Sequence, residues 1–214
     1  MKHGHHRGSS LEGLVAERRL SLKNLRPEIM EYRTGLLYSR EKNTFDFQIL
    51  NRRYKLSYPD LIVLDENRKE AAEFWQALVL HYLATADAAP LSHEWVSLRD
   101  LPDTMLYEKA FQGYSGLKLA KALGNNEDDF RRAAESLGAI SVDKGDAAYV
   151  FWALPRVPLL VIYWLGDEEF PPSAQFLFDA NAAHYLPSDA LAVVSGWLCG
   201  MIIRAAGIKE ANTL

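Results

Sequence analysis

Residues 147–179 read AAYVFWALPRVPLLVIYWLGDEEFPPSAQFLFD, at the centre of the stretch from Asp146 to Ser188 that decides the fold. Three apolar runs lie here, separated by Pro, Gly and charged residues: Ala147–Leu154, Val157–Leu165 and Ala174–Asp179. Runs of this kind, rich in Val, Ile, Tyr, Trp and Phe and bounded by turn residues, are typical of β-strands. The stretch therefore predicts a three-stranded antiparallel meander.

The middle run, Val157–Leu165, is apolar at nearly every position, which predicts a strand buried on both faces. Two apolar helices are the expected covers. One is predicted over residues 68–86, where apolar side chains recur with helical spacing, and the other includes the apolar segment Ala190–Ile203. Within the last helix, Gly196 and Gly200 are expected to allow a close approach to a neighbouring helix.

Residues 44–58 predict a hairpin. Apolar and polar residues alternate on either side of a turn at residues 50–53, so one face is expected to be buried and the other wet. We expect this hairpin and the meander at 147–179 to form one antiparallel sheet packed against several helices, which is an α+β fold. Further helices are predicted from Ser9-Ser10 to Leu22, from Pro27 to Gly35, from Tyr114 to Leu123 and from Asn126 to Gly138.

The 214 residues carry 24 Lys and Arg against 28 Asp and Glu, which gives a net charge of −4. One domain over residues 9–214, after a flexible His-rich tail at residues 1–8, is the simplest organisation for this length. The chain lacks the basic block of a nucleic-acid binder. Its most apolar segment, Ala190–Ile203, is shorter than the ~20 residues of a membrane span. We therefore expect a soluble cytoplasmic protein with neither a nucleic-acid nor a membrane partner.

The sequence contains none of the short motifs that mark common reaction chemistries: no phosphate-binding loop, dinucleotide-binding glycine turn, nucleophile elbow, zinc-protease helix or calcium loop. Its one cysteine, Cys199, excludes an internal disulfide and any four-thiolate metal or iron–sulfur site within one copy of the chain. The pattern indicates no specific cofactor and no metal site, although His3, His5 and His6 of the tail could hold a metal ion adventitiously.

Asp179 and His184 are the leading candidates for catalysis. A carboxylate and an imidazole close together near a helix start could act as a base and the group that orients it. The alternative is structural: Asp179 caps the following helical turn, and His184 bonds the nearby backbone. His81, on the apolar side of the helix predicted at 68–86, is a further catalytic candidate, with a buried structural histidine as the alternative.

Two further groups are candidates for binding. Asp167, Glu168 and Glu169 lie together in the loop between two predicted strands, and clustered carboxylates can bind a hard cation or raise one another's pKa. The alternative is an acidic, solvated loop. His93, Glu94 and Trp95 form the second group, for which the alternative is a loop anchored by a buried Trp95.

Five segments resemble one known family, the domain of unknown function 3786, over roughly residues 30–205. They are His81-Tyr82-Leu83, Pro90–Pro102, Pro155–Leu159, Gly166–Pro171 and His184–Pro187. The resemblance implies an uncharacterised bacterial or archaeal protein without assigned catalytic residues. Some relatives carry a cysteine-rich iron–sulfur segment, which implies anaerobic redox or corrinoid-linked metabolism. The lone Cys199 cannot hold such a cluster, so a redox role would need a partner protein or a non-thiolate cofactor.

These observations favour a cytoplasmic ligand-binding or accessory protein, linked by the resemblance to anaerobic redox, corrinoid or metalloenzyme metabolism, with a small molecule or a protein as its partner. A small-molecule hydrolase or lyase is the first alternative, using Asp179 and His184 with acidic help from residues 167–169. A scaffolding or oligomerisation protein is the second, and it predicts a large apolar surface patch and no pocket.

Overall fold

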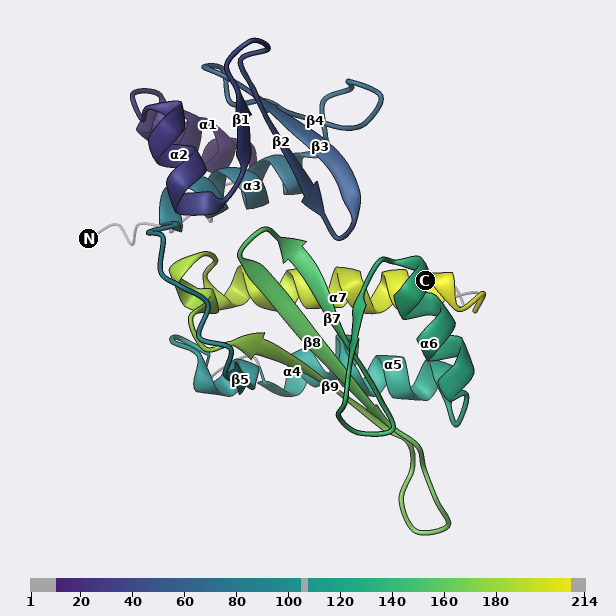
Figure 1. Ribbon diagram of the computed structural model, residues 1–214. Helices are drawn as coiled ribbons and strands as arrows, with labels where there is room; N and C mark the ends of the chain where they lie inside the picture. Colours follow the sequence, from purple (N-terminus) through teal and green to yellow (C-terminus); the bar gives the residue numbers. More distant parts are fainter. Residues whose placement is uncertain (1–10, 105–107, 209–214) are drawn as a thin grey trace, which may run out of the picture. The chain divides into compact units, whose positions relative to one another are not determined.

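The computed structural model describes residues 11–104 and 108–208. They group into two compact units, the first comprising residues 11–47 and 53–88 and the second comprising residues 48–52 and 89–208 (Figure 1). Helices and two antiparallel sheets make up the described chain, so the predicted α+β class is confirmed. The expected single domain stays a prediction, and the His-rich tail at residues 1–8 lies outside the described residues.

The hairpin and the meander belong to two different sheets rather than to the one sheet that we expected. The hairpin strands β2 (Thr44–Ile49) and β3 (Arg52–Ser57) pair instead with the short strands that flank them in sequence, β1 (Leu37–Ser39) and β4 (Val63–Leu64). Strands that are close in sequence pair at a low cost in loop entropy. The hairpin therefore completes a four-stranded sheet of its own.

Three helices complete the first unit: α1 (Leu11–Leu22), α2 (Pro27–Thr34) and α3 (Glu73–Thr85). As predicted, α2 begins at Pro27 and ends at Gly35, which takes the left-handed backbone conformation (φ 73°). From α3, the buried amide of Gln76 accepts a hydrogen bond from Val63 N (2.9 Å) and donates one to Val63 O (2.8 Å). The side chain of Gln76 thus satisfies both the N–H and the C=O of Val63 in β4.

The second unit contains a five-stranded sheet in the order β5-β9-β8-β7-β6, all antiparallel. Its strands are β5 (Trp95–Val96), β6 (Ile140–Val142), β7 (Ala147–Leu154), β8 (Val157–Trp164) and β9 (Ser173–Asp179). Its helices are α4 (Glu108–Tyr114), α5 (Gly116–Leu123), α6 (Glu127–Ser136) and α7 (Ser188–Ala205), with short 3₁₀ turns η1 (Leu98–Asp100) and η2 (Ala182–His184). The predicted meander is therefore confirmed as β7, β8 and β9.

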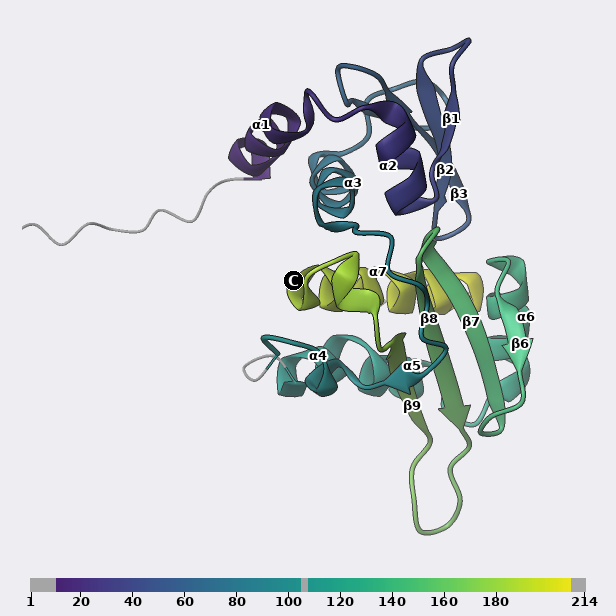
Figure 2. The ribbon, with the colours of Figure 1, turned by 60° about the vertical axis from the view of Figure 1, so that its left-hand side comes forward.

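Strand β8 is buried at every position except Trp164, which is half-buried. On one face, the ring of Phe130 from α6 lies 5.2 Å from the ring of Tyr163 and 5.6 Å from that of Tyr149 on β7. Helices α4, α5 and α7 lie along the same sheet in Figure 2. This face of the sheet therefore has the helical cover that we expected.

The other face of the sheet holds a smaller cluster of buried side chains, Ala148, Leu160 and Ile162. The partly buried side chains around this cluster are those of Trp95, Val142, Val150, Trp164 and Leu177. The helix predicted at 68–86, which we expected here, is α3 of the first unit, where it packs against α1. Within the second unit, large side chains of the sheet itself surround the cluster.

Helix α7 is the buried core helix that its composition predicts. By length and composition alone it could cross a membrane, but 61% of it is buried inside the protein, as expected for the core helix of a folded domain. Its buried side chains include Leu191, Val194, Leu198 and Ile202, at the spacing of one helix face. The opposite face of α7 carries Gly196, Trp197 and Gly200.

The helix predicted over 114–123 is interrupted at Ser115, where α4 ends and α5 begins. The hydroxyl of Ser115 donates a hydrogen bond to Phe111 O, at 2.5 Å. A methyl group built on Gly116 would lie 2.1 Å from the carbonyl oxygen of Ala174 on β9. Only glycine therefore lets the start of α5 approach the sheet this closely.

We predict that Gly116→Ala destabilises the protein by about 1–3 kcal/mol, because the added methyl group would push α5 away from β9. Gly113→Ala in α4 is the matched control, since nothing lies within 4 Å of a methyl group there. Alanine favours a helix by up to about 1 kcal/mol over glycine, so the control should be neutral or stabilising. Urea unfolding of both variants measures the difference, and equal stabilities would contradict the close approach.

Candidate functional site

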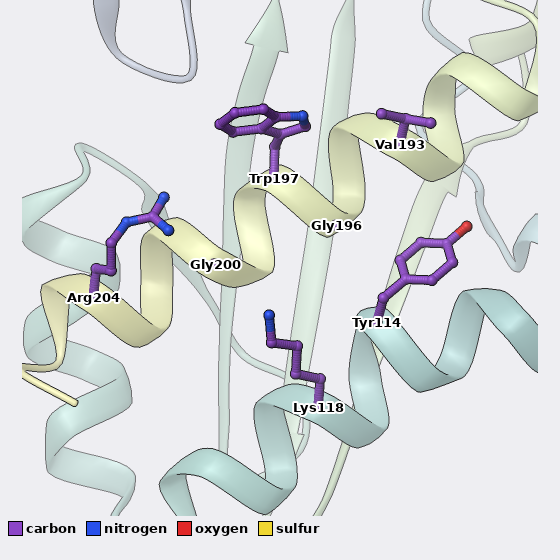
Figure 3. A pocket seen from close by; sticks show the side chains of 7 residues that line it. All are labelled: Tyr114, Lys118, Val193, Gly196, Trp197, Gly200 and Arg204. Carbon is purple, nitrogen blue, oxygen red and sulfur yellow. The ribbon is translucent and has the colours of Figure 1, made fainter. Parts of the chain in front are cut away.

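Side chains of α4, α5 and α7 enclose a hollow of about 440 Å³ on the second unit (Figure 3). Small-molecule sites usually enclose about 300–1,000 Å³, so the hollow has the size of a site for a small ligand. It is shallow and widely open to solvent. The residues that line it are Tyr114, Lys118, Val193, Gly196, Trp197, Gly200 and Arg204.

The periodicity of α7 creates this hollow. Five of its residues fall three or four positions apart and share one face of the helix: Val193, Gly196, Trp197, Gly200 and Arg204. The two glycines form a floor without side chains. The larger residues on the same face then project as walls, while the opposite face of α7 is fixed in the core.

The two glycines of α7 make room for different groups. A methyl group on Gly196 would lie 3.0 Å from Cδ2 of Tyr114, so this glycine admits a ring from α4, as the predicted close approach requires. At Gly200 the nearest atoms belong to the guanidinium of Arg204, with Nη1 at 3.2 Å. Side chains on a helix point toward its N-terminus, and Arg204 folds back one turn over Gly200 in this way (Figure 3). Gly200 therefore accommodates a side chain of its own helix.

The walls combine an aromatic surface with two cations. The indole of Trp197 is 44% exposed, and it projects with Val193 from the edge of α7 that lies away from α5 (Figure 3). From the other side Lys118 extends from α5 toward α7. The seven lining residues include no carboxylate, imidazole, thiol or aliphatic hydroxyl. The described lining residues thus offer aromatic surface, two cationic groups and a phenol.

Asp179, the first catalytic candidate, is buried at the end of β9 and binds the backbone. Its Oδ1 accepts hydrogen bonds from Ser92 N (3.0 Å) and Asn181 N (2.9 Å), and its Oδ2 accepts one from His93 N (2.8 Å). Burial by itself would raise the pKa of Asp179, but the hydrogen bonds from Ser92, Asn181 and His93 outweigh it and lower the pKa. The carboxylate joins the segment before β5 to the end of β9.

His184 lies on η2, and its side chain is exposed. Among the described residues, the carboxylate of Asp179 has no hydrogen bond to the imidazole of His184. Asn181, between them, donates from its side chain to Pro90 O (2.8 Å) and strengthens the same loop. His81 is half-buried on α3, in the first unit. A catalytic role for these three residues stays a prediction.

The group at 93–95 meets Asp179 through its backbone. The side chains of His93 and Glu94 are exposed, and His93 takes a left-handed conformation (φ 60°). Trp95 is half-buried, pairs with Asp179 across β5 and β9, and packs against the cluster that contains Leu160. The half-buried Trp95 thus holds this segment against the sheet, and both a binding role for the three residues and the alternative of a loop anchored by a buried Trp95 stay predictions.

The carboxylates of residues 167–169 are all exposed in the loop between β8 and β9. Asp167 accepts hydrogen bonds from Glu169 N and Phe170 N, both at 2.8 Å, and these bonds lower its pKa. Asp167 thus shapes the loop, and a binding role for it, Glu168 and Glu169 stays a prediction. Across residues 11–104 and 108–208 no group of three His, Cys, Asp or Glu could hold a metal ion.

Cys199 is not among the residues that line the hollow. Cys199 is buried, and its Sγ donates to Ser115 O (3.3 Å). This contact is that of a packed structural thiol, as the apolar surroundings of Cys199 in the sequence predict. His3, His5 and His6 lie outside the described residues.

The chain belongs to the family described as Domain of unknown function (DUF3786), because the profile of this family matches residues 26–201 of its 214 residues. The resemblance that the sequence indicates is therefore confirmed. No curated protein and no solved structure matches the chain.

We predict that Asp179→Asn lowers stability by about 1–3 kcal/mol at neutral pH, because an amide placed opposite His93 N leaves that part-buried donor unsatisfied. The lowered pKa of Asp179 sets the sign of the pH dependence. Its stabilisation is complete above the unfolded value of about 3.9 and disappears as the pH falls through the lower folded value. The difference between wild type and variant should therefore shrink in acid.

Urea unfolding between pH 3 and pH 7 measures this difference. Glu94→Gln is the control, since it removes an exposed carboxylate from the same loop and should change stability by less than about 0.5 kcal/mol. A destabilisation by Asp179→Asn that stays constant over this range would contradict the role of the charge.

Proposed function

We propose that this protein binds a small molecule and that the hollow between α4, α5 and α7 is its binding site. The observation that carries the proposal is the exposed indole of Trp197 at the edge of a depression floored by two glycines. A large aromatic side chain in such a place has apolar surface to bury. Covering apolar surface stabilises a complex by about 25 cal/mol per Å².

The shape of the hollow favours a ligand with a flat body. Because Gly196 and Gly200 have no side chains, the ring of Tyr114 and the guanidinium of Arg204 lie close to the backbone of α7, and a planar ring can lie against these two groups beside the indole. The phenol of Tyr114 adds a second aromatic surface and a hydroxyl that can donate or accept a hydrogen bond. The volume of about 440 Å³ suits one or two fused rings with substituents.

The two alternatives have less support. A hydrolase or lyase would use Asp179 as a base, but this carboxylate accepts three backbone hydrogen bonds and its pKa is lowered, which makes it a poor proton acceptor. A scaffolding protein is expected to lack a pocket, and the second unit has one. Ligand binding is the function that agrees with both observations.

The family resemblance supplies the biological setting of the proposal. The resemblance implies anaerobic redox or corrinoid-linked metabolism, and together with the absence of a reaction motif it favours a cytoplasmic accessory protein of such metabolism. A protein of this kind would hold a small ligand, or pass it to a partner protein, without transforming it. The absence of carboxylate, imidazole and thiol from the lining of the hollow supports such a role.

The proposal predicts that a flat aromatic compound quenches the fluorescence of Trp197 in a saturable way. Suitable probes are 2-naphthamide, 2-naphthoate and 2-naphthyl phosphate, which share one ring system and differ in charge. Trp197→Phe should abolish the saturable change. The matched control is Trp152→Phe, which removes a Trp of similar exposure (39%) on β7 and should keep it.

Two results would overturn the proposal. One is that none of the three probes gives saturable quenching of the wild type. The other is that Trp152→Phe and Trp197→Phe reduce the quenching equally, because the probes would then bind aromatic surface in general rather than this hollow.

A further inference from the structure

We infer that the ligand of this hollow carries an anionic group, a carboxylate or a phosphate, and that Lys118 and Arg204 hold it between them. The inference rests on the proposed binding site and adds the chemical class of the ligand. Its basis is the convergence of two cations, from two different helices, on one small volume.

The two cationic side chains reach the hollow from separate directions. Lys118 extends from α5 toward α7, and Arg204 folds back along α7 toward Gly200 (Figure 3). Among the described residues that line the hollow none is acidic, although the chain as a whole has a net charge of −4. Like charges that converge on a site raise the local potential and attract an anion.

Arg204 makes no ion pair with any carboxylate in the part of the chain that the structure describes. Other exposed arginines of the second unit do have acidic partners: Arg131 pairs with Glu127, and Arg132 pairs with Asp129. The guanidinium of Arg204 instead lies over Gly200 with its donors directed to the hollow. It is therefore available to a ligand.

The presence of glycine at position 200 also indicates that the position of the Arg204 guanidinium matters, because glycine destabilises a helix. Glycine inside a helix is less stable than alanine by about 0.5–1 kcal/mol. At Gly200 the nearest atoms to an added methyl group belong to the guanidinium of Arg204, so glycine here makes room for the cation. The helix is therefore less stable here than it would be with alanine, but the guanidinium of Arg204 can lie close to the backbone of α7 at Gly200.

The chemistry of the two cations defines the anion. Arginine offers a planar fork of N–H donors that matches two oxygens of a carboxylate or phosphate, and lysine adds a compact positive charge. The indole of Trp197 is placed for the flat part of the same molecule. The ligand class is thus an aromatic or heteroaromatic ring that bears a carboxylate or a phosphate.

The test compares the same three probes, by fluorescence titration, on the wild type, Lys118→Met and Arg204→Met. We expect 2-naphthoate or 2-naphthyl phosphate to bind the wild type at least about tenfold more tightly than neutral 2-naphthamide. Each variant should weaken the anion by at least about tenfold and leave the amide unchanged. The control is Lys121→Met, an exposed lysine of α5 that does not line the hollow.

The outcomes separate this inference from the proposed function. Equal binding of the amide and both anions, or unchanged anion binding in both Met variants, overturns the anionic class while the binding site stands. Failure of all three probes to bind at Trp197 overturns the site itself. Tighter binding of the phosphate or of the carboxylate supports the inference and shows which of the two groups the hollow prefers.

Gly200→Ala gives a second test that does not depend on removing a charge. The added methyl group should stabilise α7 but displace the guanidinium of Arg204, so the unfolding midpoint should rise while affinity for the preferred anion falls. A structural role for Gly200 in helix packing would instead lower the midpoint. Unchanged anion affinity in this variant would contradict the proposed position of Arg204.

Discussion

Burial of the apolar strand β8 is the constraint on which the second unit depends. Its side chains need cover on both faces, and the aromatic contacts of Tyr163 with Phe130 place the helical layer on one of them. Helix α7 packs against α4, α5 and α6 within this layer. Its apolar face is buried in the core of the unit. Val193, Trp197 and Arg204 on its remaining face are exposed, and there they form the hollow together with Gly196 and the buried Gly200. The candidate site is thus a consequence of how the core is covered.

Local signals in the sequence predicted the individual elements well, and long-range contacts explain what they missed. The meander at 147–179, the start of α2 at Pro27 and the cap of α6 at Asn126 each depend on a few adjacent residues. The separate sheets depend on β1 and β4, which have only three and two residues and leave little pattern to detect. The close approach of Gly116 to the sheet depends on a carbonyl of β9, far away in sequence.

The candidate site was harder to predict than the fold, for a physical reason. Asp179 and Asp167 attract notice as carboxylates in turns, yet acidic side chains in such places commonly bind nearby backbone N–H groups, and both do so here. Lys118 and Arg204 look like ordinary surface cations until α5 and α7 bring them together. The available signal is the pair Gly196 and Gly200 on one face with Trp197, and in the sequence alone this pair indicates helix packing rather than room for the guanidinium of Arg204.

The most direct test of the central claim, that the exposed face of α7 binds an anionic aromatic ligand, is a chemical-shift map of the ¹⁵N-labelled protein during titration with 2-naphthoate. The account predicts saturable shifts of the Trp197 indole N–H and of the backbone amides of Gly196 and Gly200. The indole signals of Trp95 and Trp152, which lie on the sheet, should stay in place. Shifts centred on the sheet, or no saturable shift on α7, would contradict it.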